Sequence, residues 1–360
     1  MKYGLIVYFN TENIGDDIQS CAMANFLPHV DYLIDREHLD SFYTPTGEKV
    51  AAILGGWYIH LSLNWPPSPY LHLLPLSFHL TSGGKRSITL TDYGLEWLKK
   101  FVMIGCRDEG TVRLLESQGI VAYLSGCFTL TFKPFPNVDH HGKIVLIDLP
   151  EEMVDFVRKH TKKETVLVSH AYKLQSTLPP EVKKFVAEHT EKGAVATSHI
   201  PNIPCPPNWN ARRALVEGLL RFYQGASLIV TNRLHATLPT LAVGTPVLLV
   251  SDNIQSNYRF STFLPYVNNT TPEDLFSGKY AFNFDEPKAN PGGHEKFAER
   301  IRLACADFVA SCESAPVAPP IDFETWLDGQ KRATRLKQLM RNLAVNATNN
   351  KPINASLYKF

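Results

Sequence analysis

Short apolar runs, each followed by a segment of helical periodicity, recur along the whole chain of 360 residues. Strand-length runs that alternate with helices are typical of βαβ units, and such units build parallel sheets. The expected strands fall into two sets, and they cover residues 5–9, 51–54, 101–105 and 120–124, then 143–149, 165–169, 194–197, 227–231 and 246–250. The sequence therefore predicts an α/β protein.

The two sets of strands predict two domains, because a single core stops growing at a few hundred residues. Residues 133–142 separate the sets, with two prolines, a glycine and no periodicity, which is the composition of a linker. We expect a first domain over residues 1–132 and a second over 143–312. Residues 313–360 then form a further linker, a basic helix and a tail.

The charge balance restricts the partners of the protein. Lysine and arginine number 36 against 35 aspartates and glutamates, and 44% of residues are hydrophobic against 20% charged. This is the balance of a well-cored globular chain. A net charge of +1 argues against nucleic acid as a partner, because binding over a whole surface needs a positive field. An anionic ligand must be bound by a few placed residues.

Compartment signals are sparse. No run reaches the roughly 18 apolar residues that span a bilayer, and the first ten residues read as a strand with no cleavage site behind them. The six cysteines are scattered without metal-ligand spacing, which favours buried reduced thiols. We expect a cytoplasmic protein, soluble or peripheral to the inner face of the membrane.

Two regions interrupt the alternation. Residues 57–83 are rich in aromatics and prolines, and we expect a long loop or a pair of short helices there, whose rings either fill the core or stack on a sugar. Residues 322–343 form the predicted basic helix, with acids first and bases last, the order that the helix dipole favours. Its basic end is either a solvated face or a contact with an anionic membrane.

A first candidate binding segment follows the first strand. Gly15, Asp16 and Asp17 stand at the start of a predicted helix. A glycine before an aspartate-capped helix places backbone N–H groups and the positive dipole end at the carboxyl edge of the sheet, where ligands of open α/β sheets bind. A plain helix cap is the alternative. A second candidate, Arg107, follows another strand and is suited to a carboxylate or phosphate, unless it pairs only with Asp108 or Glu109.

The strongest segment is Thr231-Asn232-Arg233-Leu234-His235-Ala236. A buried strand brings a fixed cation and a titratable imidazole into the turn before a helix, so both can address one small anion. Arg233 is the expected anchor and His235 the proton donor or acceptor. His170 ends another predicted strand and faces the same cleft if it is not purely structural.

Taken together, these segments resemble the polysaccharide pyruvyl transferase family. The resemblance spans residues 1–310 and rests on the order and spacing of 13–19, Arg107-Asp108-Glu109, 119–130, 231–236 and 242–247. It implies two Rossmann-like domains in a GT-B-type arrangement with an interdomain cleft. It also implies transfer of the enolpyruvyl unit of phosphoenolpyruvate onto two sugar hydroxyls as a cyclic ketal, in cell-surface or exopolysaccharide biosynthesis, with Arg233, Leu234 and His235 forming the phosphoenolpyruvate pocket.

This chemistry requires anion-binding groups and one acid or base, and neither a metal nor a cofactor. We therefore expect His235 as the acid/base, and Arg233, Arg107 and Arg259 as binders of carboxylate and phosphate. Arg259 stands where the family often has a lysine. The sugar acceptor, free or lipid-linked, would lie toward Gly15, Asp16 and the aromatic segment.

Two other functions stay open. A GT-B glycosyltransferase that uses a nucleotide sugar would share the architecture, but residues 246–258 contain no glutamate that could bind a ribose, which favours pyruvyl transfer. A non-catalytic binding protein could also keep the fold.

Overall fold

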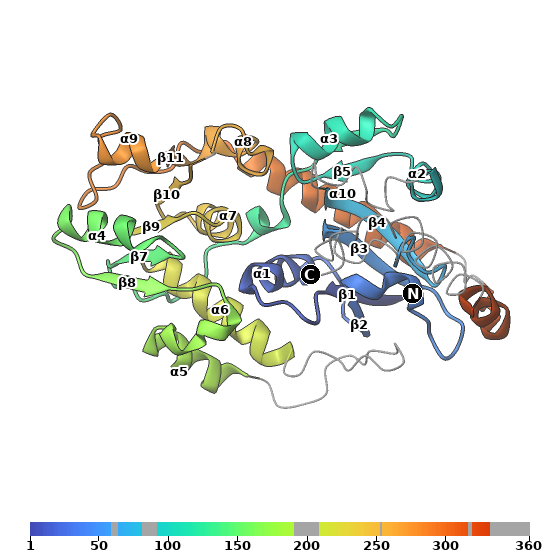
Figure 1. Ribbon diagram of the computed structural model, residues 1–360. Coiled ribbons are helices and arrows are strands. Elements are labelled where there is room, and N and C mark those ends of the chain that lie inside the picture. The colour runs from blue at the N-terminus through green and yellow to red at the C-terminus, as the bar shows by residue number, and fades with distance from the viewer. Residues whose placement is uncertain (59–63, 81–91, 191–208, 253, 316–318, 332–360) are drawn as a thin grey trace, which may run out of the picture.

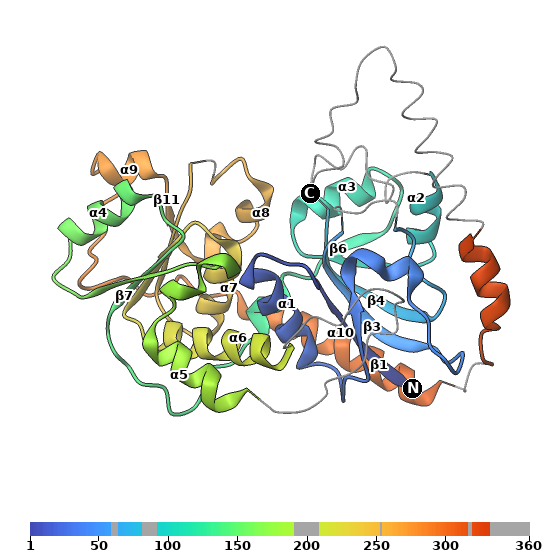
Figure 2. The same ribbon diagram turned by 60° about the horizontal axis from the view of Figure 1, so that its bottom comes forward.

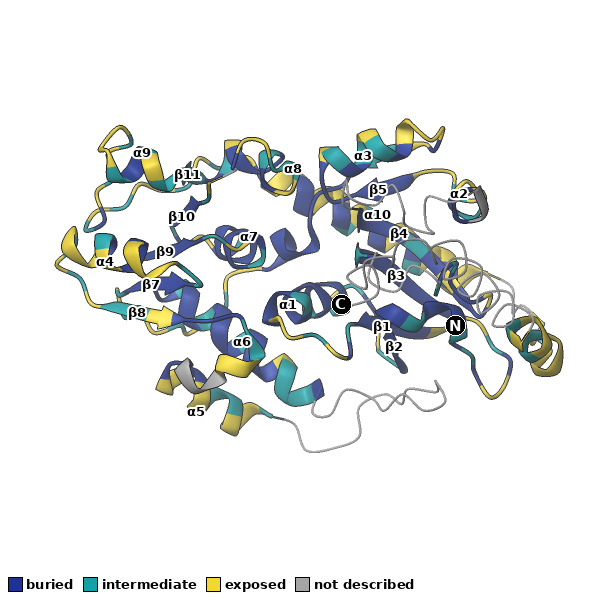
Figure 3. Cartoon of the chain, viewed as in Figure 1, coloured by how far each residue is buried: buried dark blue, intermediate teal, exposed yellow. Residues whose placement is uncertain are grey.

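The computed structural model describes residues 1–58, 64–80, 92–190, 209–252, 254–315 and 319–331. Two parallel sheets lie side by side, each with helices on its faces (Figure 1). The central strands of both sheets are buried, some edge strands are only partly buried, and exposed residues gather on the outer helices (Figure 3). The predicted α/β class with two Rossmann-like domains is confirmed.

The first sheet has six strands in the order β2-β1-β3-β4-β5-β6. Four of them match expected strands: β1 (Lys2–Val7), β3 (Val50–Trp57), β5 (Ile104–Cys106) and β6 (Ala122–Leu124). The strand β2 (Tyr32–Asp35) was not expected. The helices of this half are α1 (Ile14–Ala24), η1 (Arg36–Ser41), α2 (Asp92–Leu98), α3 (Glu109–Glu116) and η4 (Phe128–Thr131).

Strand β4 (Leu71–His79) corrects the prediction of a loop or short helices over residues 57–83. It lies between β3 and β5, and Pro75 hid it, because proline is rare in a central strand. A bulge accommodates the proline: Leu54 faces Pro75 and Gly56 faces Phe78, so one residue of β3 opposes two of β4. Ser77, in that extra step, has a φ of 58°.

Four aromatic rings of this region pack into the core of the first domain. Tyr58, Trp65, Tyr70 and Phe78 are each at most 5% exposed. Tyr58 stacks on Phe78 with ring centroids 5.3 Å apart, and Trp65 meets Trp97 edge-on at 5.0 Å. Of the two alternatives left open for these rings, core filling holds for these four residues. Residues 59–63 and 81–83 lie outside the described residues.

The second sheet has five strands in the order β11-β10-β9-β7-β8. The expected strands correspond to β7 (Ile144–Ile147), β8 (Thr165–Val168), β9 (Leu228–Thr231) and β10 (Val247–Val250), and β11 (Asn268–Thr270) was missed. The expected strand at 194–197 lies outside the described residues. The helices here are α4 (Glu151–Lys159), η5 (Tyr172–Thr177), α5 (Pro180–His189), α6 (Trp209–Gln224), α7 (Leu234–Ala242), α8 (Tyr258–Ser261), η6 (Leu264–Tyr266) and α9 (Pro272–Phe276).

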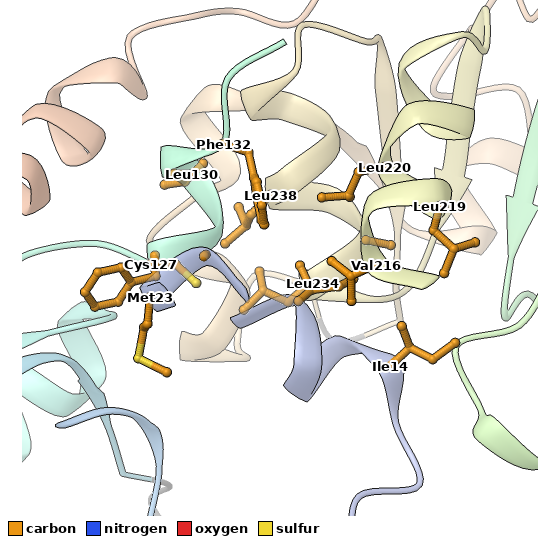
Figure 4. Close-up of a cluster of buried hydrophobic side chains, with 14 of the residues drawn as sticks. Ile14, Met23, Cys127, Leu130, Phe132, Val216, Leu219, Leu220, Leu234 and Leu238 are labelled. Atoms are coloured by element: carbon orange, nitrogen blue, oxygen red, sulfur yellow. The ribbon is translucent and has the colours of Figure 1, made fainter. Parts of the chain in front are cut away.

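The two domains share one hydrophobic core. Helix α1 and the η4 turn of the first domain pack against α6 and α7 of the second (Figure 4). Ile14, Leu130, Leu219 and Leu234 are each at most 4% exposed there. Because each fully buried aliphatic side chain contributes roughly 1.5–3 kcal/mol, this contact fixes the domains along the α1 side.

The chain returns to the first domain after β11. Helix α10 (Glu295–Ser314), which the predicted boundary assigned to the second domain, lies along the first sheet (Figure 2). Phe297 fills the space beside Gly126, and Phe308 stacks on His72 of β4 with centroids 5.4 Å apart. The predicted linker, residues 133–142, contains no helix or strand.

The predicted basic helix is described only over residues 323–331. It is held on the first domain: the N–H of Ile321 donates to the carbonyl of Gly47 at 2.8 Å, and Trp326 packs edge-on to Tyr70. The bases Arg332, Arg335, Lys337 and Arg341 lie outside the described residues, so contact of this end with a membrane stays a prediction. Across the described residues, no helix is both long enough and apolar enough to span a membrane.

Candidate functional site

Gly15 and His235 meet where the amino-terminal ends of α1 and α7 approach each other. A Cβ placed on Gly15 would lie 3.1 Å from Cβ of His235 and 3.4 Å from its Nδ1. Asn13 caps α1 by accepting the N–H of Gly15 through Oδ1 at 3.0 Å. The expected aspartate cap is thus an asparagine cap, and Gly15 is needed for the space that the imidazole occupies.

His235 has an unpaired ring nitrogen. Its Nε2 is buried and forms no hydrogen bond within the described part of the chain. Burial lowers the pKa of His235 well below its usual range, and the positive charges of Arg107 and Arg259 lower it further. The imidazole is neutral at pH 7 as long as no anion lies beside it.

Arg107 is a buried cation with spare hydrogen-bonding capacity. It is 1% exposed, and its Nε and Nη2 have no hydrogen-bond acceptor among the described residues. Asp108 Oδ2 lies 3.5 Å from Arg107 Nε but 2.6 Å from His79 Nδ1. Asp108 Oδ1 also accepts the N–H of Thr111 at 2.9 Å, so this carboxylate caps α3 as well as balancing Arg107.

The electrostatics of this group follow from burial. Burial opposes the charge of Asp108, but His79 and Arg107 outweigh it and lower the pKa of Asp108 to about 2. Burial and the Arg107 charge lower the pKa of His79 to about 4. Asp108 is therefore charged and His79 neutral at pH 7, so Arg107 and Asp108 are the two charged members of this group.

Arg259 and Arg233 come from the second domain. Arg259 is an exposed residue at the domain boundary. Partial desolvation and the charge of Arg107 lower its pKa, and no ion pair of its side chain occurs within the described ranges. Arg233 precedes α7 and is half-exposed, and its Nε lies 3.0 Å from Asp148 Oδ2. We call Arg107, Arg233, Arg259 and His235 the cationic cluster.

His170 borders this cluster but is already paired. It is 1% exposed, and its Nε2 lies 2.9 Å from the Tyr223 hydroxyl. Burial lowers its pKa to about 4, with Asp148 opposing the shift. Its carbonyl accepts the N–H of Ile14 at 2.8 Å, which connects the second domain to the start of α1. The contacts of His170 are those of a structural residue at the border of the site.

The two aspartates of α1 are engaged elsewhere. Asp17 is fully buried and binds Arg212 of α6, whose Nε lies 2.8 Å from Oδ2, and it also accepts the Tyr172 hydroxyl. Burial raises the pKa of Asp17, and Arg212 opposes the shift. Asp16 accepts Thr11 Oγ1 at 2.6 Å and Arg36 Nη1 at 3.2 Å. Asp17 thus joins the domains, and Asp16 anchors Arg36 at the edge of the first sheet.

Leu234 contributes a backbone rather than a side chain. Its side chain is 3% exposed and lies in the interdomain core beside Ile14 (Figure 4). It is the first residue of α7, so its N–H is among the unpaired donors at that helix end.

Sequence reasoning missed several residues that support the site. Asp148 receives Arg233 and also accepts Ser169 Oγ at 2.7 Å. It directly follows an apolar strand, so a search for acids at strand ends would have found it. Arg212, Arg36 and Tyr223 carry no such signal, because their partners are distant in sequence.

The arrangement suits a small, multiply charged anion. Three arginines and a histidine meet at the domain boundary, and the amino-terminal ends of α1 and α7 add partial positive charge. Over the described ranges, no group of three or more metal-ligating side chains occurs. A cavity of about 810 Å³ lies at the other end of α1, among residues of the linker and α6, and none of the predicted site residues lines it.

Fold and cluster together define a two-domain α/β protein with a group of cationic side chains at the boundary between its halves. The family model described as polysaccharide pyruvyl transferase matches residues 13–253, more than half of the chain. The chain belongs to this family, as its motifs predicted, and its class is that of a transferase.

Other comparisons show weaker similarity. No curated protein matches the chain significantly. Among solved structures, the uncharacterized protein KP1_0663 of Klebsiella pneumoniae is 13% identical, with a TM-score of 0.38 over 75% of this chain and 92% of that one. S. aureus MnaA, in a co-structure with UDP, is 13% identical, with a TM-score of 0.43 over 89% and 100%. The wall teichoic acid polymerase TagF is 8% identical, with a TM-score of 0.35 over 95% and 90%.

Proposed function

We propose that the protein transfers the enolpyruvyl unit of phosphoenolpyruvate to two hydroxyls of a sugar, which forms a cyclic pyruvate ketal and releases phosphate. The family supports this reaction class, and the cationic cluster carries the proposal for this chain. Phosphoenolpyruvate presents a carboxylate and a phosphate a few bonds apart. Arginines from both domains suit such a ligand.

In this proposal Arg107 and Arg259 bind the two anionic groups, and Arg233, held by Asp148, binds at the exposed side. The unpaired Nη2 of Arg107 supplies a donor that needs no rearrangement. A hydrogen bond to a charged group contributes about 1.5–3 kcal/mol, so each arginine would account for roughly 10- to 100-fold in affinity.

His235 would act as the acid. The bound anion offsets the repulsion from Arg107 and Arg259, so the imidazole gains a proton when the donor binds. His235 then protonates the methylene carbon, a sugar hydroxyl adds to the oxocarbenium-like centre, and that hydroxyl's proton restores His235. Phosphate departs, and it accepts the proton that the second hydroxyl loses as this hydroxyl closes the ketal. A positioned acid contributes about a hundred- to ten-thousandfold in rate.

The acceptor is proposed to be a sugar of cell-surface or exopolysaccharide biosynthesis, either free or carried by a lipid. The carboxyl edge of the first sheet, with Gly15 and Asp16, is the proposed acceptor side. Neither a metal nor a cofactor is part of this proposal.

The test follows phosphate release from phosphoenolpyruvate in the presence of a panel of free and lipid-linked sugars. We expect sugar-dependent release that Arg107→Lys and His235→Ala abolish. Arg113→Lys is the matched control, because Arg113 stands exposed on α3. Release of a nucleotide from a nucleotide sugar would instead favour a glycosyltransferase, and binding without turnover would favour a non-catalytic protein.

A further inference from the structure

Tyr258, the first residue of α8, is seated directly on Gly110 of α3. A Cβ placed on Gly110 would lie 2.6 Å from Cγ and 2.9 Å from Cβ of Tyr258, distances that real Cβ atoms do not show. A glycine inside a helix costs roughly 1 kcal/mol relative to alanine. The space for the tyrosine ring accounts for a glycine at this position.

Two hydrogen bonds fix the same contact. The Tyr258 hydroxyl donates to the carbonyl of Leu80 at 3.2 Å, just after β4. The N–H of Glu109 donates to Thr262 Oγ1 at 3.0 Å, which joins the start of α3 to the end of α8. The Tyr258 ring also lies 5.9 Å from the His79 ring. We call this set of contacts between the domains the Tyr258 latch.

The latch stands beside two arginines that repel each other. Arg259 follows Tyr258 directly in the sequence, and Arg107 stands three positions before Gly110. The Arg107 charge lowers the pKa of Arg259, so the two guanidinium groups lie within electrostatic reach. Asp108, 3.5 Å from Arg107, offsets only part of this repulsion, because the pKa of Arg259 is lowered on balance. Without an attractive contact between α3 and α8, the two cations would move apart.

We propose that Tyr258 is a positioning residue: seated on Gly110, it holds Arg259 of the second domain close to Arg107 of the first, so that one donor with two anionic groups is bound by both domains. This inference rests on the proposed function for the identity of the donor. The contacts on the α1 side fix the other edge of the boundary, and the latch closes the α3 side.

The first test is a set of substitutions in the latch. Gly110→Ala and Tyr258→Ala are expected to raise KM for phosphoenolpyruvate by about 10- to 100-fold with a smaller change in kcat, because they misplace one charged hydrogen-bond donor. Tyr258→Phe keeps the ring on Gly110, so its KM for phosphoenolpyruvate should be closer to that of wild type. Gly329→Ala is the control, since a Cβ there meets nothing within 4 Å.

A double-mutant cycle separates positioning from a general loss of structure. In an Arg259→Ala background, Gly110→Ala should have little further effect on KM, because the latch acts through Arg259. In an Arg233→Ala background the two effects should add. Additivity with Arg259→Ala, or an unchanged KM in both latch variants, would overturn the latch.

Binding of inorganic phosphate distinguishes failure of the latch from failure of the proposed function. One outcome is that wild type binds phosphate, that Gly110→Ala weakens this binding, and that phosphoenolpyruvate is not turned over. This outcome would support the latch and contradict the proposed reaction. If wild type and Gly110→Ala turn over phosphoenolpyruvate equally well, the proposed reaction is supported and the latch is contradicted. If wild type binds neither anion, both are wrong.

Discussion

Gly15 of α1 lies against the imidazole of His235, with 3.1 Å between a Cβ placed on the glycine and the Cβ of the histidine. The contact couples the start of the first domain's first helix to the proposed acid in the second domain. A methyl group there must displace the imidazole by a few tenths of an ångström.

Gly15→Ala is therefore expected to lower kcat for sugar-dependent phosphate release by roughly 10- to 100-fold, since a misplaced acid loses much of its contribution. The measurement is steady-state kinetics, with thermal unfolding as the check on folding. An unchanged kcat in a folded variant would show that the His235 ring does not need this space.

Arg107 and His235 are electrostatically linked, which gives a second prediction. Because the Arg107 charge lowers the pKa of His235, Arg107→Gln is expected to raise that pKa toward the usual range. Titration of the ¹⁵N-labelled imidazole by NMR measures it, and Arg113→Gln on the exposed face is the control. A His235 pKa that stays the same in Arg107→Gln would place the arginine's charge too far away to matter.

The ion pair between Asp17 and Arg212 predicts a large loss of stability. Removing one partner of a buried pair leaves an uncompensated charge and typically costs about 3–5 kcal/mol. Arg212→Met should lower the free energy of unfolding by this amount in urea denaturation. Arg113→Met on α3 is the control, because Arg113 and its partner Glu109 are both more than half exposed and such pairs contribute only about 0.3–0.5 kcal/mol. Equal effects of the two substitutions would contradict an interdomain role for Asp17.

Acid is expected to destabilise the protein through its buried histidines. His79 and His170 titrate with pKa values of about 4 when folded, against an ordinary 6.5. The unfolded chain therefore binds more protons between these values, so stability is complete above pH 6.5 and falls as pH drops toward 4. The slope is roughly 1.4 kcal/mol per pH unit for each histidine.

Urea unfolding at pH 7 and pH 5 measures that slope, and His170→Asn should reduce it. Asp108 acts in a different window: its lowered pKa of about 2 stabilises the fold above the ordinary aspartate value, and this contribution is lost only as pH falls toward 2. If His170→Asn showed the same slope as wild type, the folded-state pKa of His170 would be close to its ordinary value.

The alternation of strands and helices was readable from the sequence because it is a local pattern. Eight of the nine expected strands correspond to strands of the structure, and the ninth lies outside the described residues. The errors have local causes as well. Pro75 hid β4, whose bulge is explained only by pairing with β3, and β11 was missed because its three residues are all polar.

The sequence also pointed to the cationic residues of the candidate site. One strand is followed by Arg233, Leu234 and His235, and another by Arg107. Residues that follow parallel strands lie at the carboxyl edge of the sheet. The tertiary structure decided how each charge is used. Asp17 pairs with an arginine 195 positions away, the aromatic segment fills a core, and Tyr258 settles on Gly110. Such pairings depend on how two domains dock, and docking is a balance of burial and desolvation over the whole interface that no local pattern encodes.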